Sequence, residues 1–284
     1  MRLCVLSSGS GGNALWVEAG SARVLVDAGL SYRETRRRCA RAGIDLRDVS
    51  DVLLTHEHAD HCYGAATIAR KLSARVHATR GTLLALRDPP PEELRFPLPS
   101  STGGEYGDLL LGPLRIRAVS VPHDAVEPVA YVLEERCADG RSVRAAVVTD
   151  LGCTTRKLVS SLQGLDALVL EMNHDVRLLL EGPYPMSLKR RVRGDFGHLS
   201  NGQAAQLLAR TVHPGLRQVV LAHLSEQNNT PAHARREAEA VLELRGSRAS
   251  LHVATQARPS DVFQIEPGAA SHRVRRPQQL ALFG

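Results

Sequence analysis

The segment Thr55–His61 constrains the fold more than any other part of the chain. It has the sequence Thr-His-Glu-His-Ala-Asp-His, and it directly follows the apolar run Val52–Leu54. An alanine-rich helical pattern begins near Ala65, so we expect the segment to form a tight turn between a buried strand and a helix. Four ligand-type side chains then share one short turn: His56, His58, Asp60 and His61.

These side chains favour a metal site. Imidazole nitrogen and carboxylate oxygen together suit Zn, Mn or Fe. His56 and His58 alternate on extended backbone and can reach one ion, whereas Asp60 and His61 lie at the helix start and can reach a second ion nearby. Scattered histidines usually belong to a solvated loop, but the spacing H-x-H-x-D-H indicates metal ligands.

Further candidate ligands stand where apolar strands are expected to end. His123 follows the run Ala118–Pro122, Asp150 follows Ala145–Thr149, and His223 follows Val219–Ala222. One such residue would be an ordinary core or capping side chain, but together with Thr55–His61 they predict one site at a common sheet edge. Asp27, after the run Val24–Val26, either orients ligand imidazoles from behind or caps a turn. Both interpretations remain open.

The composition is that of a globular protein. The chain has 284 residues, of which 43% are hydrophobic and 23% charged. We expect no membrane span, no signal peptide and a cytoplasmic location, because no apolar run approaches membrane length and Met1–Leu6 leads straight into a strand pattern. The odd number of cysteines, 5, indicates reduced thiols.

Hydrophobic periodicity predicts an α+β fold. The expected strands are Leu3–Ser7, Ala14–Glu18, Arg23–Val26, Val52–Leu54, Arg75–Ala78, Asp108–Leu111, Leu114–Val121, Val129–Glu135, Val143–Thr149, Ala167–Glu171, Gln218–Ala222, Ser250–Ala254 and Asp261–Ile265. The expected helices are Tyr32–Ala42, Ala65–Leu72, Thr155–Leu162, Asn201–Val212 and Ala232–Leu244. This order fits two sheets covered by helices on their outer faces, with a surface loop over Asp88–Gly104. We expect one domain over residues 1–266 and a basic, disordered tail over 267–284.

The positive charge favours a polyanionic partner such as DNA. The net charge is +6. The basic residues gather in three clusters: Arg36–Arg38 with Arg41, Lys189–Arg191 with Arg193, and Arg273 with Arg275 and Arg276. Each cluster alone is typical of a solvated helix face. Beside a metal centre they indicate a nucleic-acid substrate.

The ligand set resembles, in order and context, the binuclear site of metallo-β-lactamase-fold hydrolases. The resemblance covers residues 1 to about 265 and implies a four-layer αββα sandwich with two divalent ions, Zn or Mn, at one edge. It implies that His56, His58 and His123 bind the first ion. Asp60, His61 and His223 would bind the second ion, and Asp150 would bridge both.

A narrower group of segments is similar to the YycJ (WalJ) subfamily. The segments are Leu6–Asn13, Val121–Ala125, Thr149–Gly152, Leu170–Asp175, Gly197–Asn201 and Leu221–Ser225, with Asn228 and Asn229. Members of this subfamily are similar to DNA exonucleases proposed to act in repair. The resemblance therefore implies hydrolysis of DNA phosphodiesters, for which we expect 5′ to 3′ polarity.

Phosphodiester hydrolysis also needs a proton donor for the departing oxygen. His198 is the first candidate for this donor role or for a phosphate contact, since Gly197–Asn201 opens a helix whose N-terminus favours anions, and His174 is the second. We also count the candidate ligand Asp60 among the catalytic residues. Either histidine could instead be structural. Lys189, Arg190, Arg191 and Arg193 precede His198 and are expected to contact the substrate backbone. The loop Ser7–Asn13 forms either a phosphate cradle or, as we favour, a tight hairpin.

The tail carries a short docking pattern. Gln279, Leu280, Leu282 and Phe283 give Q-L-x-L-F, which resembles the motif that docks bacterial repair proteins to the sliding clamp. The alternative is a tail that folds back on its own domain. For the whole chain, a small-molecule hydrolase of thioester, lactone or cyclic phosphodiester bonds is the alternative function, because the fold alone does not decide the substrate. A purely metal-stabilised binding module is disfavoured.

Overall fold

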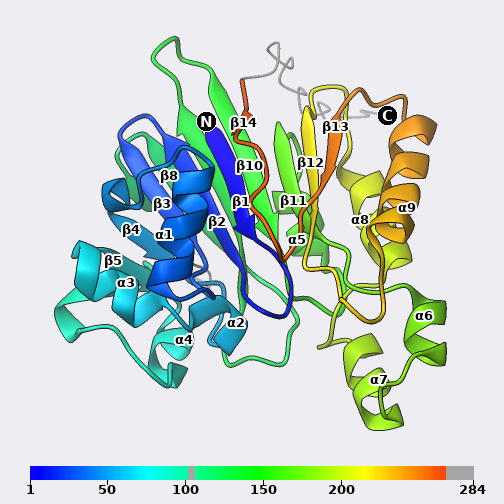
Figure 1. The fold of residues 1–284 in the computed structure, drawn as a ribbon. Coiled ribbons are helices and arrows are strands. Elements are labelled where there is room, and N and C mark those ends of the chain that lie inside the picture. The colour runs from blue at the N-terminus through cyan, green and yellow to red at the C-terminus, as the bar shows by residue number, and fades with distance from the viewer. Residues whose placement is uncertain (102–105, 267–284) are drawn as a thin grey trace, which may run out of the picture.

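The computed structural model describes residues 1–101 and 106–266. Within these residues, two seven-stranded sheets pack face to face (Figure 1). The first sheet has the order β14 (Phe263–Gln264), β1 (Arg2–Ser7), β2 (Ala14–Ala19), β3 (Ala22–Val26), β4 (Asp51–Leu53), β5 (Arg75–Ala78), β6 (Arg95–Pro97). The second has the order β13 (Ser250–Val253), β12 (Gln218–Ala222), β11 (Ala167–Glu171), β10 (Ser142–Val148), β9 (Val129–Arg136), β8 (Leu114–Ser120), β7 (Leu109–Leu111).

Helices cover the outer face of each sheet (Figure 1). Those on the first sheet are α1 (Tyr32–Arg41), α3 (Ala65–Leu72) and α4 (Arg80–Ala85). Those on the second sheet are α5 (Arg156–Ser161), α8 (Asn201–Thr211) and α9 (Pro231–Leu244). Three short helices lie at one end of the sandwich: α2 (Ala59–Cys62), α6 (Val176–Glu181) and α7 (Met186–Arg193). The expected αββα arrangement is confirmed.

Three apolar cores separate the four layers. Strand β1 shows why its residues are apolar on both faces: Leu3 and Val5 join the core between the sheets, whereas Cys4 and Leu6 join the core beneath α1 and α3. Successive side chains of a strand point to opposite faces, so a strand in a middle layer is buried on both. The second sheet packs on α5, α8 and α9 through its own outer core.

Strand direction gathers the polar residues at one edge of the sandwich. Strands β10, β11 and β12 run parallel, as do β3 and β4. The carboxyl ends of parallel strands meet at the same edge of a sheet. Asp150 follows β10 by two residues, Glu171 ends β11, and His223 directly follows β12.

The backbone is strained at this edge. Asp27, Asp150 and His223 have φ values of 61°, 59° and 54°, in the left-handed region that non-glycine residues seldom adopt. In the described part of the chain only one further non-glycine residue, Ser73, has positive φ. Such strain persists where the surrounding structure holds it and is typical of functional sites.

The structure adds elements that the sequence pattern did not indicate. Helices α4, α6 and α7 were not predicted, because each is 6 or 8 residues long and has no extended apolar face. The expected surface loop Asp88–Gly104 contains β6 and the 3₁₀ turn Glu92–Leu94, so that prediction was wrong for its middle part. Among the described residues, no helix combines the length and apolar character that a membrane crossing requires.

Candidate metal centre

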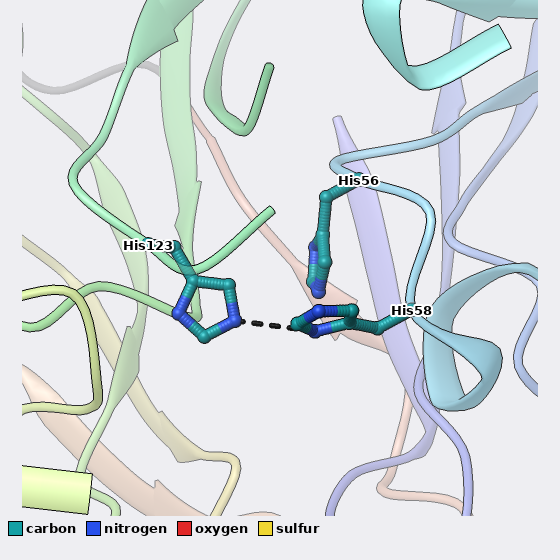
Figure 2. A group of neighbouring side chains, drawn as sticks. All are labelled: His56, His58 and His123. Atoms are coloured by element: carbon teal, nitrogen blue, oxygen red, sulfur yellow. Dashed lines mark hydrogen bonds between the residues drawn. The ribbon is translucent and has the colours of Figure 1, made fainter. Parts of the chain in front are cut away.

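His56, His58 and His123 form one compact group (Figure 2). His56 and His58 leave the turn after β4, and His123 enters from the segment after β8. Their rings lie 4.6 to 5.0 Å apart between centroids, and His58 Nδ1 is 3.3 Å from His123 Nε2. One nitrogen of each ring lies within 4.8 Å of the others, which is close enough for a shared cation.

A second group adjoins the first. Asp60, His61 and His223 also place one ligand atom each within 4.8 Å of the others, and Asp60 Oδ2 lies 3.4 Å from Nε2 of both histidines. Asp150 stands between the groups: it lies 3.1 Å from His61, 3.5 Å from His223 and 4.0 Å from His123. All seven predicted ligands therefore converge, and Asp150 reaches both groups.

The chemistry of His56 fits a metal ligand. Its Nδ1 is 3.0 Å from the Thr55 hydroxyl, whereas its Nε2 is buried without a hydrogen-bond partner. A buried nitrogen of this kind is costly unless it binds something. Burial holds the pKa of His56 well below its ordinary value, with a further contribution from His61, and burial also lowers the pKa of His123. Both imidazoles are thus neutral, which is the form that binds metals.

The second group is rich in negative charge. Burial opposes protonation of His61 and His223. The carboxylates of Asp150 and Asp27 nevertheless raise the pKa of His61 well above its ordinary value. Those of Asp150 and Asp60 raise the pKa of His223 to about 10. The buried carboxylates therefore attract positive charge into this spot. A divalent cation would satisfy the same oxygens.

Asp27 lies behind the ligands. Its Oδ2 is 2.8 Å from His61 Nδ1, and its Oδ1 accepts a hydrogen bond of 2.8 Å from the Thr55 backbone N–H. The carboxylate thus turns the far nitrogen of His61 toward the centre and also caps the turn. The contacts that each of the two interpretations requires are therefore both present.

The structure adds Glu171, to which the sequence gave no role. Its buried Oε1 lies 2.7 Å from His198 Nδ1, and its Oε2 accepts hydrogen bonds from the backbone N–H groups of Leu151 and Leu199. Glu171 and Asp150 raise the pKa of His198 against the opposing effect of burial. Its position in the sequence could have indicated a role, because Glu171 ends the strand between the two strands that lead to Asp150 and His223.

The Ser7–Asn13 loop also reaches the centre. It closes the β1–β2 hairpin, as we favoured, and Gly9 and Gly12 adopt φ values of 140° and 139°. Asn13 Nδ2 lies 3.0 Å from His61 Nε2 and 3.3 Å from Asp60 Oδ2. The Ser8 hydroxyl accepts a 2.7 Å hydrogen bond from the His223 backbone N–H. The hairpin thus supports ligands of the second group.

A cavity of about 250 Å³ opens over the two groups. His198 lines it, whereas His174 is buried elsewhere, so the structure does not bring His174 to the cavity. Its remaining lining includes Tyr184, Leu188, Arg191 and Val192 from α7 and the segment before it.

The four basic residues of α7 do not all face the predicted substrate. Lys189 is buried, and its ammonium donates to the Leu180 carbonyl at 2.6 Å. Its charge instead caps the carboxyl end of α6. The predicted contact of Lys189 with substrate therefore conflicts with its position. Arg190, Arg191 and Arg193 are exposed, and Arg191 pairs with Asp124 at 2.5 Å on the cavity wall.

The chain is similar in sequence to known proteins. A family model described as the beta-lactamase superfamily domain matches residues 22–224. The exodeoxyribonuclease YycJ of Bacillus anthracis is 36% identical over 249 residues, which cover 87% of this chain and 90% of that protein. The exodeoxyribonuclease WalJ of Streptococcus pneumoniae is 33% identical over 231 residues, covering 80% and 83%.

The fold also occurs in other proteins of known structure. The metallo-β-lactamase-fold protein YhfI from Bacillus subtilis superposes with a TM-score of 0.63 at 13% identity, over 91% of this chain and 98% of that one. At this identity the likeness concerns the fold alone. It agrees with the two sheets and outer helices described above.

Proposed function

Because the chain belongs to the β-lactamase superfamily, and within it to the family of YycJ and WalJ, we propose that it is a metal-dependent exodeoxyribonuclease. The observation that carries the proposal is the identity to relatives named exodeoxyribonucleases, over most of both chains, together with two adjoining groups of metal-type ligands. Fold alone would leave the substrate open.

We propose that the centre holds two divalent ions, Zn or Mn. His56, His58 and His123 would hold one, and Asp60, His61 and His223 the other, with Asp150 shared. The first group, with three imidazoles, and the second group, with two imidazoles and the Asp60 carboxylate, support this division. When bound, such ions activate water and neutralise charge on phosphoryl oxygens.

The protein's own side chains supply the remaining requirements of the reaction. Glu171 accepts from Nδ1 of His198, and the His198 ring lines the cavity, where a protonated imidazole can give its proton to the departing 3′ oxygen. Arg191 lines the cavity, and the exposed Arg190 and Arg193 lie on the same helix, so the three would contact the neighbouring phosphates. Asp60 orients the second ligand group through both of its histidines.

We further propose 5′ to 3′ polarity and a cytoplasmic role in DNA repair. The Q-L-x-L-F pattern over Gln279–Phe283 lies outside the described residues, and we propose it as a sliding-clamp docking motif on the strength of its sequence. The resemblance to the YycJ and WalJ exodeoxyribonucleases supports the repair role.

An end-labelled substrate panel tests the proposal. Duplex DNA, single-stranded DNA, RNA and a generic phosphodiester, each with Mn or Zn, should show metal-dependent release of mononucleotides from DNA 5′ ends. Asp60→Ala should abolish the release. Glu243→Ala, which removes an exposed carboxylate at the far end of α9, is the matched control and should leave it unchanged. Turnover of small esters without DNA cleavage would refute the proposal and favour the small-molecule hydrolase.

A further inference from the structure

Phe196 presents a large apolar ring to solvent beside the metal centre. It is 63% exposed and lies in the segment between α7 and His198. A single exposed apolar residue is ordinary on a protein surface, but an exposed aromatic ring two residues from a candidate proton donor is informative.

The backbone that carries this ring is firmly held. The Phe196 carbonyl accepts a 3.0 Å hydrogen bond from Asp124, and the next carbonyl, of Gly197, lies 3.0 Å from Nδ1 of the metal-type ligand His123. Gly197 and His198 donate to the carbonyls of Gly194 and Val192, at 2.8 and 2.9 Å. A Cβ on Gly197 would meet the Arg191 carbonyl at 2.2 Å, so this close approach requires glycine. The exposed ring is therefore attached to a rigid backbone segment.

Phe196 is joined to the centre through Asp124. The Asp124 backbone N–H donates to the Phe196 carbonyl. The Asp124 carbonyl lies 3.2 Å from His58 Nε2, and one of its carboxylate oxygens lies 3.4 Å from His123 Nε2. The backbone that carries the ring is thus linked to the first ligand group through one residue. A nucleotide adjacent to one bound at the metals would lie near this segment.

Positive charge accompanies the ring. Arg191 pairs with the same Asp124, and its side chain remains 62% exposed. The cavity wall that continues from it carries the apolar side chains Leu188 and Val192 and the ring of Tyr184. A guanidinium flanked by aromatic and apolar side chains matches the alternation of phosphate and base along a single strand.

We propose that Phe196 and Arg191 bind an unpaired nucleotide, the ring by stacking on its base and the guanidinium by contacting its phosphate. The enzyme then prefers single-stranded or frayed ends, because the base faces in a duplex are already stacked on their neighbours. This inference rests on the proposed function and specifies its substrate.

Binding to a nuclease-resistant strand tests the stacking directly. Fluorescence anisotropy with the metal-loaded protein would compare a phosphorothioate thymidine strand, an abasic strand of equal length and a blunt duplex. The Phe196→Ala variant should bind the thymidine strand about tenfold more weakly than the wild type does. It should bind the abasic strand as the wild type does. Phe196→Tyr should restore binding. Leu244→Ala, which removes a residue 84% exposed at the far end of α9, is the control and should change nothing.

Two further readouts separate this inference from the proposed function. Phe196→Ala should leave the salt dependence of binding unchanged, whereas Arg191→Ala should reduce its slope. Suppose that the wild type degrades DNA but the Phe196→Ala variant binds the thymidine strand normally, or loses as much affinity for the abasic strand as for the thymidine strand. The stacking role is then refuted, while the proposed nuclease function is not. If the wild type degrades no DNA, the proposed function itself is refuted.

Discussion

Glu171 Oε1 lies 2.7 Å from His198 Nδ1, in a pair that joins the end of β11 to the segment before α8. The carboxylate is fully buried and its other oxygen accepts two backbone N–H groups, so it cannot turn away. The imidazole, which lines the cavity, is consequently fixed by the bond to its Nδ1. This geometry is suited to a proton donor whose tautomer and orientation are set in advance.

His198→Ala should lower kcat on DNA by about a hundredfold or more, within the usual contribution of general acid catalysis. The same variant should lose little on a p-nitrophenyl phosphodiester, because p-nitrophenolate departs without a proton. Steady-state kinetics would measure the loss of kcat on each of the two substrates. His252→Asn, on the edge strand β13, is the control. An equal loss on the two substrates would contradict the donor role and indicate a structural histidine.

Asp27→Asn should weaken metal binding about tenfold to a hundredfold, as substitutions behind a ligating imidazole commonly do. Asparagine tolerates the left-handed backbone of position 27, where φ is 61°, so the fold should remain. The amide cannot replace the carboxylate that faces His61 Nδ1 at 2.8 Å. Competition with a chromophoric chelator would measure the affinity. Unaltered metal affinity with a normal circular dichroism spectrum would show that Asp27 only caps the turn.

Arg191→Ala and Lys189→Met should differ although the residues are two positions apart. Arg191→Ala should reduce the slope of log affinity against log salt by about one unit, because one phosphate contact is lost. Lys189→Met should keep that slope but lower the midpoint of urea unfolding, since the Lys189 ammonium bonds the Leu180 carbonyl. Salt titrations of DNA binding and urea denaturation would measure the two effects. A lower salt slope in Lys189→Met would restore the prediction made from the sequence.

Removal of residues 278–284 should abolish binding to the sliding clamp in a pull-down and leave hydrolysis of short DNA intact. The short apolar motif would supply the anchors, and the tether would only raise the local concentration of the enzyme. Substitution of Leu282 and Phe283 by alanine in the full chain is the narrower variant and should act like the deletion. Clamp binding that survives both changes would refute the docking proposal.

The fold and the convergence of the candidate ligands could be predicted because both leave local signals. His56 and His58 occupy a short motif, and His123, Asp150 and His223 each follow an apolar run that ends in a polar residue. The side chains that support them leave weaker signals. Glu171 stands at the last position of an apolar strand, where a carboxylate gains meaning only once neighbouring strands are known to be parallel.

The failures in the prediction share a physical cause. Lys189 and Arg191 look alike in a basic run, but helix geometry turns one toward the Leu180 carbonyl and the other toward Asp124. His174 and His198 look alike as histidines in polar segments, yet tertiary packing buries the first and exposes the second to the cavity. Sequence spacing alone does not state which face of an unpredicted short helix meets the site.

His174 should make the protein less stable as the pH falls. Burial lowers its pKa from 6.5 to about 4, and its Nδ1 is buried without a hydrogen-bond partner. The unfolded chain therefore binds a proton at higher pH than the folded chain does. The stability that neutral His174 allows is complete above pH 6.5 and declines as pH falls toward 4, by about 2 kcal/mol between pH 7 and pH 5. Urea unfolding at several pH values would measure it.

His174→Gln should remove that part of the pH dependence. Its free energy of unfolding should fall between pH 7 and pH 5 by about 2 kcal/mol less than that of the wild type. Both proteins carry the same metal ligands, whose titration cancels in the difference between them. The sign is diagnostic, because a protonated, ion-paired His174 would gain stability over this range and the variant would then show the steeper fall. Parallel pH profiles for the two proteins would mean that His174 keeps its ordinary pKa in the folded state.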